Sequence, residues 1–114
     1  MHRLLYIEDN PINAVIVEEL LRTRPDIALR VAVTGAQGLQ LAADWQPALV
    51  LLDERLPDGS GSALLPRLRE LLPRARLVSL SAGERPLPGF DACWRKPLDF
   101  GVFHRSLQDW LAPL

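Results

Sequence analysis

Short apolar runs alternate along the chain with longer stretches in which apolar residues recur every three or four positions. Each run is bounded by turn-forming or charged residues, as buried parallel strands are. The runs lie at residues 4–7, 29–33, 48–52 and 77–80, with a fifth and weaker run at 91–95. This pattern predicts five short strands.

The longer stretches predict four helices, at residues 11–24, 35–44, 60–72 and 98–111. The first has Asn10 as a candidate N-cap and Pro11 at the first helical position, where proline is favoured. The third contains Pro66, so we expect that helix to begin late enough to place Pro66 in or near its first turn. The fourth carries Phe103 and Leu107 on one face, which we expect to be buried.

The order of these elements predicts the fold class. Strands that alternate with helices imply right-handed crossovers and a parallel sheet that is covered on both faces. We therefore predict an α/β fold with a doubly wound five-stranded parallel sheet in the flavodoxin-like order 2-1-3-4-5. In such sheets the ligand site lies at the carboxyl ends of the strands.

Length and charge narrow the possible functions. The 114 residues fit one compact domain, over residues 1–114. The 13 basic and 14 acidic residues are interspersed, so nothing supports binding to nucleic acid or to an anionic membrane. No apolar run approaches the roughly 20 residues that a membrane span requires. The single Cys93 cannot form an internal disulfide, and we expect it to be a small buried residue of a cytoplasmic protein.

Charged and polar residues stand at the carboxyl ends of the predicted strands. Glu8 and Asp9 follow the first strand, Asp53 the third, Ser81 the fourth and Lys96 the fifth. Three clustered carboxylates would repel one another and have raised pKa values unless a cation joined them, and Mg²⁺ fits that need. A carboxylate beside Mg²⁺ can attack a phosphoryl group. Asp53 is best placed to do so, because it follows the most apolar strand and precedes a turn-rich loop.

Four segments in this order resemble the receiver domain of bacterial two-component response regulators. They are residues 6–10 (YIEDN), 51–61 (LLDERLPDGSG), 80–82 (LSA) and 96–97 (KP). Each segment alone is weak evidence, but four of them at successive strand ends are specific, and the match covers essentially the whole chain. The opening of the chain, through residue 21, especially resembles receivers associated with hybrid sensor histidine kinases.

The resemblance implies a signalling switch rather than an enzyme. Asp53 would accept a phosphoryl group from a histidine kinase or a phosphotransfer protein, and a downstream protein would read the change. Ser81 would hydrogen-bond the phosphoryl group, and Lys96 would form an ion pair with it. The side chain of Arg55 is expected to tune hydrolysis or partner choice. The ligands that the resemblance implies for Mg²⁺ are Glu8, Asp9, Asp53 and the backbone carbonyl of Arg55.

The chain also departs from the family. Only 15 positions separate Ser81 from Lys96, about two helical turns fewer than is usual there. Two prolines and two glycines oppose any replacement helix, so we predict that the fourth helix is replaced by an irregular loop at residues 82–90. Cys93 stands where the family usually has an aromatic residue, and its neighbour Trp94 should point to the opposite face. Because many receivers dimerise through this surface, we expect a monomer or a weak dimer.

Two other functions remain open. A pseudo-receiver would keep the fold and signal through constitutive contacts; the expected loss of a helix favours it, and the complete acidic site opposes it. A phosphatase of the haloacid dehalogenase type also uses an aspartyl nucleophile, but it places a second Asp two residues later, where this chain has Arg55. The chain is also too short for the cap that such enzymes carry.

Overall fold

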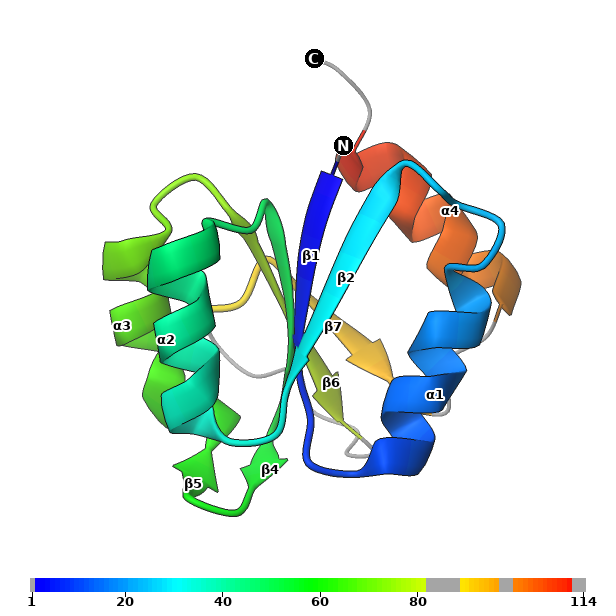
Figure 1. Cartoon of the computed structure of the whole chain (residues 1–114). Helices are drawn as coiled ribbons and strands as arrows, with labels where there is room; N and C mark the ends of the chain where they lie inside the picture. Colours follow the sequence, from blue (N-terminus) through cyan, green and yellow to red (C-terminus); the bar gives the residue numbers. More distant parts are fainter. Residues whose placement is uncertain (1, 82–88, 97–99, 112–114) are drawn as a thin grey trace.

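The central feature of the computed structural model, which describes residues 2–81, 89–96 and 100–111, is a five-stranded sheet (Figure 1). Every neighbouring pair in the sheet is parallel, and the strand order is β2-β1-β3-β6-β7. Its strands are β1 (His2–Ile7), β2 (Ile27–Ala32), β3 (Leu49–Asp53), β6 (Arg76–Ser81) and β7 (Ala92–Arg95). The two short strands β4 (Arg55–Leu56) and β5 (Gly59–Ser60) form a separate hairpin. The predicted order 2-1-3-4-5 is therefore confirmed.

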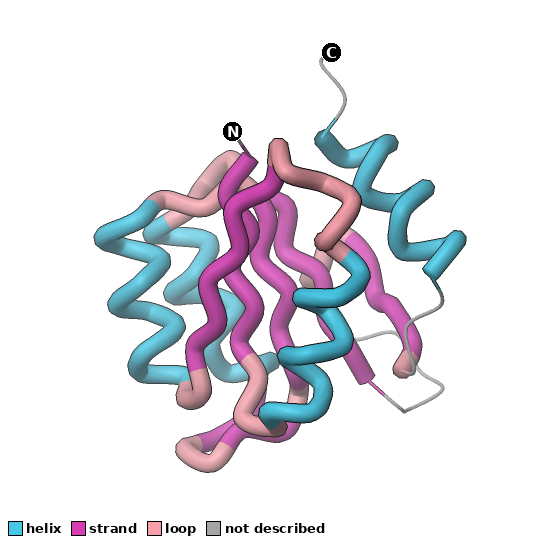
Figure 2. The backbone as a smooth tube through the Cα atoms, turned by 45° about the vertical axis from the view of Figure 1, so that its right-hand side comes forward, coloured by secondary structure: helices cyan, strands magenta, loops and turns pink. Residues whose placement is uncertain are grey.

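Helices cover both faces of the sheet (Figures 1 and 2). One face carries α1 (Pro11–Leu20) and α4 (Phe100–Leu111), and the other carries α2 (Gly35–Trp45) and α3 (Gly61–Leu71). None of these helices is long and apolar enough to cross a bilayer within the described part of the chain.

Side chains that alternate along the strands build two separate cores. In β1, Leu4 and Tyr6 belong to the core on the α1 and α4 side, whereas Leu5 and Ile7 belong to the core on the α2 and α3 side. A strand that is buried on both faces needs apolar residues at consecutive positions. This requirement explains why the sequence shows continuous apolar runs rather than strict alternation.

The first helix begins as predicted and ends earlier. Asn10 Oδ1 accepts a hydrogen bond from the Ile12 amide at 2.9 Å, which makes Asn10 the N-cap of α1. The helix ends at Leu20 rather than at Arg24. Because Arg24 precedes Pro25, the helical conformation is disfavoured there, and the chain leaves the helix through turns.

The position of Pro66 within α3 corrects a second prediction. Ser60 caps the helix by accepting a hydrogen bond from the Ala63 amide at 3.2 Å, so α3 begins at Gly61. Pro66 is therefore the sixth helical residue and lies in the second turn instead of near the first. Its ring is exposed, so the helix accommodates the proline on its solvent side rather than in the core.

The predictions for the C-terminal part of the chain are confirmed only in part. Residues 82–88 of the expected loop at 82–90 lie outside the described residues, as do residues 97–99, where the last helix was expected to begin. Phe103 and Leu107 are buried as predicted. The burial predicted for Cys93 is wrong: Cys93 is exposed, because it lies on the face of edge strand β7 opposite to Trp94, which packs against the core on the α4 side.

Candidate functional site

Three carboxylates meet at the carboxyl edge of the sheet. Glu8 and Asp9 follow β1, and Asp53 ends the neighbouring strand β3. One carboxylate oxygen from each lies within 4.8 Å of those of the other two. Glu8 and Asp53 are 2% and 7% exposed, whereas Asp9 is exposed to solvent. The cluster therefore has two buried members and one member that solvent can reach.

Lys96 brings the compensating charge from the other end of the chain. Its Nζ lies 2.9 Å from Glu8 Oε2 and 2.9 Å from Asp53 Oδ1. The backbone amide of Lys96 donates to the carbonyl of Ser81 at 3.1 Å, which holds the end of β7 beside β6. With every group ionised, three carboxylates and one ammonium leave two negative charges in excess.

Burial and hydrogen bonding act in opposite directions on these groups. Burial raises the pKa of Asp53, the hydrogen bond from Lys96 opposes this rise, and the charges of Glu8 and Asp9 add to it, so the pKa is raised. Burial acts on Glu8 in the same sense, but hydrogen bonds from Lys96, the Asn10 amide and other donors hold its pKa below the ordinary value. The sequence predicted raised pKa values only in the absence of a cation, and Lys96 is a cation in contact with both groups: the pKa of Glu8 is lowered, whereas that of Asp53 is still raised.

The pKa of the Lys96 ammonium is raised. Burial alone would lower it, but hydrogen bonds to Asp53 and Glu8 outweigh that effect. Lys96 therefore remains a cation through the physiological pH range, and it supplies part of the positive charge that balances the three carboxylates.

Tyr6 contacts the site from the core on the α1 and α4 side, and sequence reasoning missed it. Its hydroxyl donates to Glu8 Oε2 at 3.0 Å, and the backbone amide of Asn10 donates to Glu8 Oε1 at 3.2 Å. Burial raises the pKa of Tyr6, and the neighbouring charge of Glu8 raises it further, so the phenol keeps its proton. The sequence signal for this contact is the spacing of Tyr6 and Glu8, because residues two positions apart along a strand point to the same face.

The loop after Asp53 is tied to the start of α3. It forms a hairpin of β4 (Arg55–Leu56) and β5 (Gly59–Ser60). The carboxylate of Glu54 accepts hydrogen bonds from the amide and the hydroxyl of Ser62, at 3.0 and 2.8 Å. These two hydrogen bonds to Glu54 fix the direction in which the chain leaves Asp53.

The same loop is tied to α2 through Asp58. Its two carboxylate oxygens accept hydrogen bonds from the amides of Gly35 and Ala36, at 2.8 and 3.0 Å. These amides belong to the first turn of α2, where the helix dipole also favours a negative charge. No local pattern in the sequence indicates this contact, because Asp58 and Gly35 are brought together only by the packing of the loop against the helix.

The two remaining predicted site residues flank the cluster. Ser81 ends β6 and is half-buried, and Arg55 begins β4 with its side chain exposed. The phosphoryl contact predicted for Ser81 and the metal contact predicted for the Arg55 carbonyl stay predictions.

The donor set fits a hard divalent cation. Carboxylate oxygens are the ligands that Mg²⁺ prefers, and the two excess negative charges of the cluster match its charge. Both oxygens of Glu8 already accept hydrogen bonds from the protein. Asp9 and Asp53 therefore have more capacity left for direct contact with a metal ion than Glu8 has.

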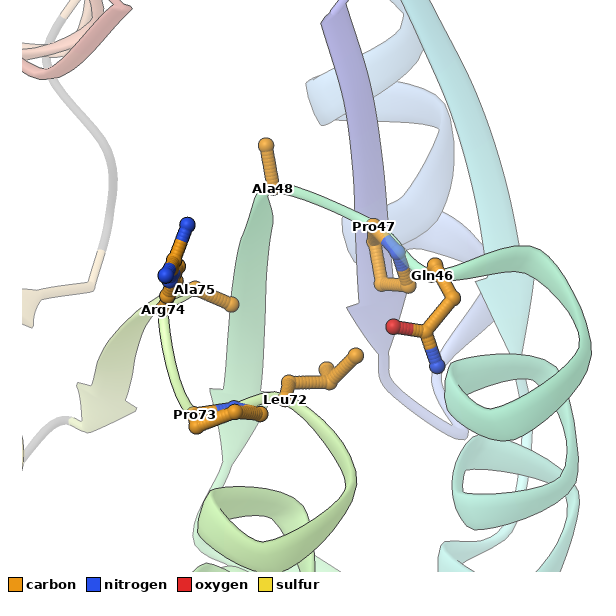
Figure 3. A pocket seen from close by; sticks show the side chains of 7 residues that line it. All are labelled: Gln46, Pro47, Ala48, Leu72, Pro73, Arg74 and Ala75. Atoms are coloured by element: carbon orange, nitrogen blue, oxygen red, sulfur yellow. The ribbon is translucent and has the colours of Figure 1, made fainter.

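Figure 3 shows the residues that line a hollow of about 310 Å³. Its lining includes Pro47, Leu72 and Pro73, which precede β3 and β6 in the chain. It is therefore at the amino edge of the sheet, opposite to the acidic cluster. The three carboxylates and Lys96 lie at the other edge, so this hollow is not part of the candidate site.

Comparison with known proteins gives a consistent result. A family model described as the response regulator receiver domain matches residues 4–88. The sensor histidine kinase TmoS of Ectopseudomonas mendocina is 35% identical over 109 residues, which are 96% of this chain and 10% of TmoS. The chain spans less than half the length of most curated relatives that it matches.

Solved structures agree with the sequence comparison. The receiver domain of the sensor histidine kinase PA1611 from Pseudomonas aeruginosa, with a magnesium ion coordinated in its active-site cleft, has a TM-score of 0.84 at 25% identity, and the match covers 98% of each chain. A response regulator from Burkholderia pseudomallei with a phosphorylated aspartic acid has a TM-score of 0.83 at 26% identity, over 95% of this chain and 67% of that one.

Proposed function

Since the chain belongs to the response regulator receiver family, we propose that it is a phosphoacceptor switch whose phosphoryl group is carried by Asp53. Receiver domains in general are signalling switches rather than catalysts of a turnover reaction. The observation that carries the proposal is the position of Asp53 at the end of a buried strand, where its carboxylate contacts the Lys96 ammonium and lies beside the carboxylates of Glu8 and Asp9.

The proposed reaction uses the carboxylate of Asp53 as the nucleophile. A carboxylate oxygen of Asp53 forms a bond to phosphorus, the N–P bond of a phosphohistidine breaks, and the donor histidine keeps the electron pair of that bond. Lys96 is placed to pair with the new negative charge because it already contacts Asp53 Oδ1. Ser81, at the end of the neighbouring strand β6, would donate to a phosphoryl oxygen.

Mg²⁺ is the cofactor that this donor set fits. Asp9, Asp53 and the backbone carbonyl of Arg55 would hold it, with Glu8 beside it, and when bound it offsets the negative charge of the transferred group. Asp9 is the solvent-exposed member of the cluster, so it would receive the ion first. Magnesium in the cleft of the PA1611 receiver supports this assignment.

The donor protein would dock beside the site on an apolar patch. The large hydrophobic side chains that are most exposed in the described residues lie in the first two turns of α1, which follows β1, and directly after β2. They are Ile12, Val15 and Ile16 on α1, and Val33 after β2. Exposed apolar surface of this kind marks contact sites, and a phosphohistidine must approach the carboxyl edge of the sheet to reach Asp53. We assign this patch to a histidine kinase or phosphotransfer protein.

Intact-protein mass spectrometry tests the proposed function. The chain is incubated with acetyl phosphate and Mg²⁺, beside Asp53→Asn and beside a sample with a metal chelator. We expect one phosphoryl adduct on the parent chain and none on the variant or in the chelated sample. If the folded parent takes no phosphate from acetyl phosphate or phosphoramidate, the proposal is wrong and the pseudo-receiver replaces it.

A further inference from the structure

The hydroxyl of Tyr6 enters the acidic cluster from the core. Tyr6 is 1% exposed and belongs to the core on the α1 and α4 side, together with Leu80 and Phe103. Its hydroxyl donates to Glu8 Oε2 at 3.0 Å. The same oxygen accepts from Lys96 Nζ at 2.9 Å. A core residue thus shares one carboxylate oxygen with the cation of the site.

The carboxylate of Glu8 is held by three donors. Tyr6 and Lys96 bind Oε2, and the backbone amide of Asn10 binds Oε1 at 3.2 Å. Glu8 is 2% exposed, so water cannot easily replace a lost donor. The orientation of this carboxylate therefore depends on each of the three donors.

Lys96 depends on Glu8 in turn. A lysine ammonium stands on a flexible four-carbon chain and takes its position from its acceptors. Here the two acceptors are Glu8 Oε2 and Asp53 Oδ1, both at 2.9 Å. If Glu8 rotates, the Lys96 ammonium loses one of the two contacts that place it beside Asp53.

We propose that Tyr6 is a positioning residue of this site: its buried hydroxyl fixes Glu8, and Glu8 fixes the Lys96 ammonium beside Asp53. This inference rests on the proposed function of Asp53. A buried tyrosine hydroxyl needs some partner in any core. Tyr6 differs from an ordinary core tyrosine because its partner is the carboxylate oxygen that anchors Lys96.

The first test compares two deletions of a buried hydroxyl. Tyr6→Phe removes the hydroxyl that binds Glu8, and Ser79→Ala removes a buried hydroxyl for which the described residues offer no hydrogen-bond partner. We expect the rate of phosphorylation by acetyl phosphate to fall about tenfold in Tyr6→Phe, which corresponds to roughly 1.4 kcal/mol, and to stay at the parent value in Ser79→Ala. An unchanged rate in Tyr6→Phe, or an equal loss in both variants, would overturn the proposal.

The second test does not need phosphorylation. Tyr6 is the only tyrosine of the chain, so tyrosine labelled with ¹³C at Cζ gives one resonance in an NMR spectrum. We expect this resonance to shift in Lys96→Met, because Glu8 Oε2 then loses its other donor, and to stay in place in Ser79→Ala. An unmoved resonance in Lys96→Met would overturn the link. If the parent takes no phosphate while this shift is present, the proposed function fails and the link between Tyr6 and Lys96 stands.

Discussion

Lys96 Nζ lies 2.9 Å from Asp53 Oδ1, although the two residues are 43 positions apart in the chain. The contact joins the last strand of the sheet to the central one, because Lys96 follows β7 and Asp53 ends β3. Lys96 also binds Glu8, so one ammonium bridges two buried carboxylates. The charge balance of the site without metal therefore depends on a residue from the far end of the chain.

Lys96→Met should make the fold more dependent on metal. The variant leaves the three carboxylates without their ammonium, so we expect a loss of about 1–3 kcal/mol in the free energy of unfolding without Mg²⁺. Added Mg²⁺ should stabilise this variant more than it stabilises the parent, because the ion then relieves more repulsion. Urea unfolding with and without Mg²⁺ measures both effects. Arg95→Met is the control, and equal stabilisation by Mg²⁺ in Lys96→Met and the parent would contradict the expectation.

Asp53→Asn should stabilise the fold in the absence of metal. The pKa of Asp53 is raised chiefly by burial, so its ionised form destabilises the folded state at neutral pH. We expect a gain on the order of 1 kcal/mol near pH 7. The gain should shrink as the pH falls through the raised pKa of Asp53, because the parent then becomes neutral at this position. Thermal unfolding between pH 4 and pH 8 checks this, and a parent that is the more stable of the two at pH 7 would refute it.

Gly61→Ala should damage the site through the backbone. A Cβ at Gly61, the first residue of α3, would overlap the carbonyl oxygen of Asp53. We expect a loss of roughly 2 kcal/mol or more in the free energy of unfolding, because relief of the overlap must displace either the end of β3 or the start of α3. The comparison is Gly59→Ala, where a Cβ meets nothing within 4 Å and only the positive φ of 149° opposes the change. Urea unfolding should rank Gly61→Ala as the more destabilised variant.

Asp58→Ala should lower stability in a pH-dependent way. Hydrogen bonds from the amides of Gly35 and Ala36 hold the pKa of Asp58 below its usual value. The stabilising effect is therefore present above the unfolded-state pKa and is lost as the pH falls through the lowered folded-state pKa. We expect a lower melting temperature than the parent at pH 7 and a smaller difference near pH 3. Asp44→Ala, at the other end of α2, removes the same charge and should not reproduce this profile.

The elements that the sequence predicted well carry local signals. The Asn10 cap and the apolar runs define the start of α1 and the positions of the five strands of the sheet within a few residues. The predicted end of α1 was too late, because the apolar pattern continues into Leu21, which is buried although it lies after the helix. The predicted position of Pro66, in or near the first turn of its helix, was wrong. The caps at the start of α3 outweigh the cost of a proline in the second turn.

Part of the site could be predicted from the order of the strands, and part depends on tertiary packing. The convergence of Asp9, Asp53 and Lys96 follows from strand order, since each stands at the carboxyl end of its strand. The contact of Asp58 with α2 depends on how a loop packs against a helix, which no local pattern encodes. The burial of Cys93 was misjudged for a related reason, because residue type alone does not say which face of an edge strand is covered.

The patch on α1 gives the last prediction, because it separates docking from chemistry. Ile16→Ser removes apolar surface from a side chain that is 41% exposed and adds no charge near the carboxylates. The donor for this test is a phosphorylated histidine kinase or phosphotransfer protein that phosphorylates the parent chain. We expect the rate of phosphoryl transfer from this donor to fall several-fold in Ile16→Ser, since the donor loses contact area. The rate with acetyl phosphate should stay at the parent value, because this small donor needs no docking surface. Ala43→Ser, on the exposed side of α2, serves as the control, and an equal loss with both donors would move the patch from docking to the chemistry of the site.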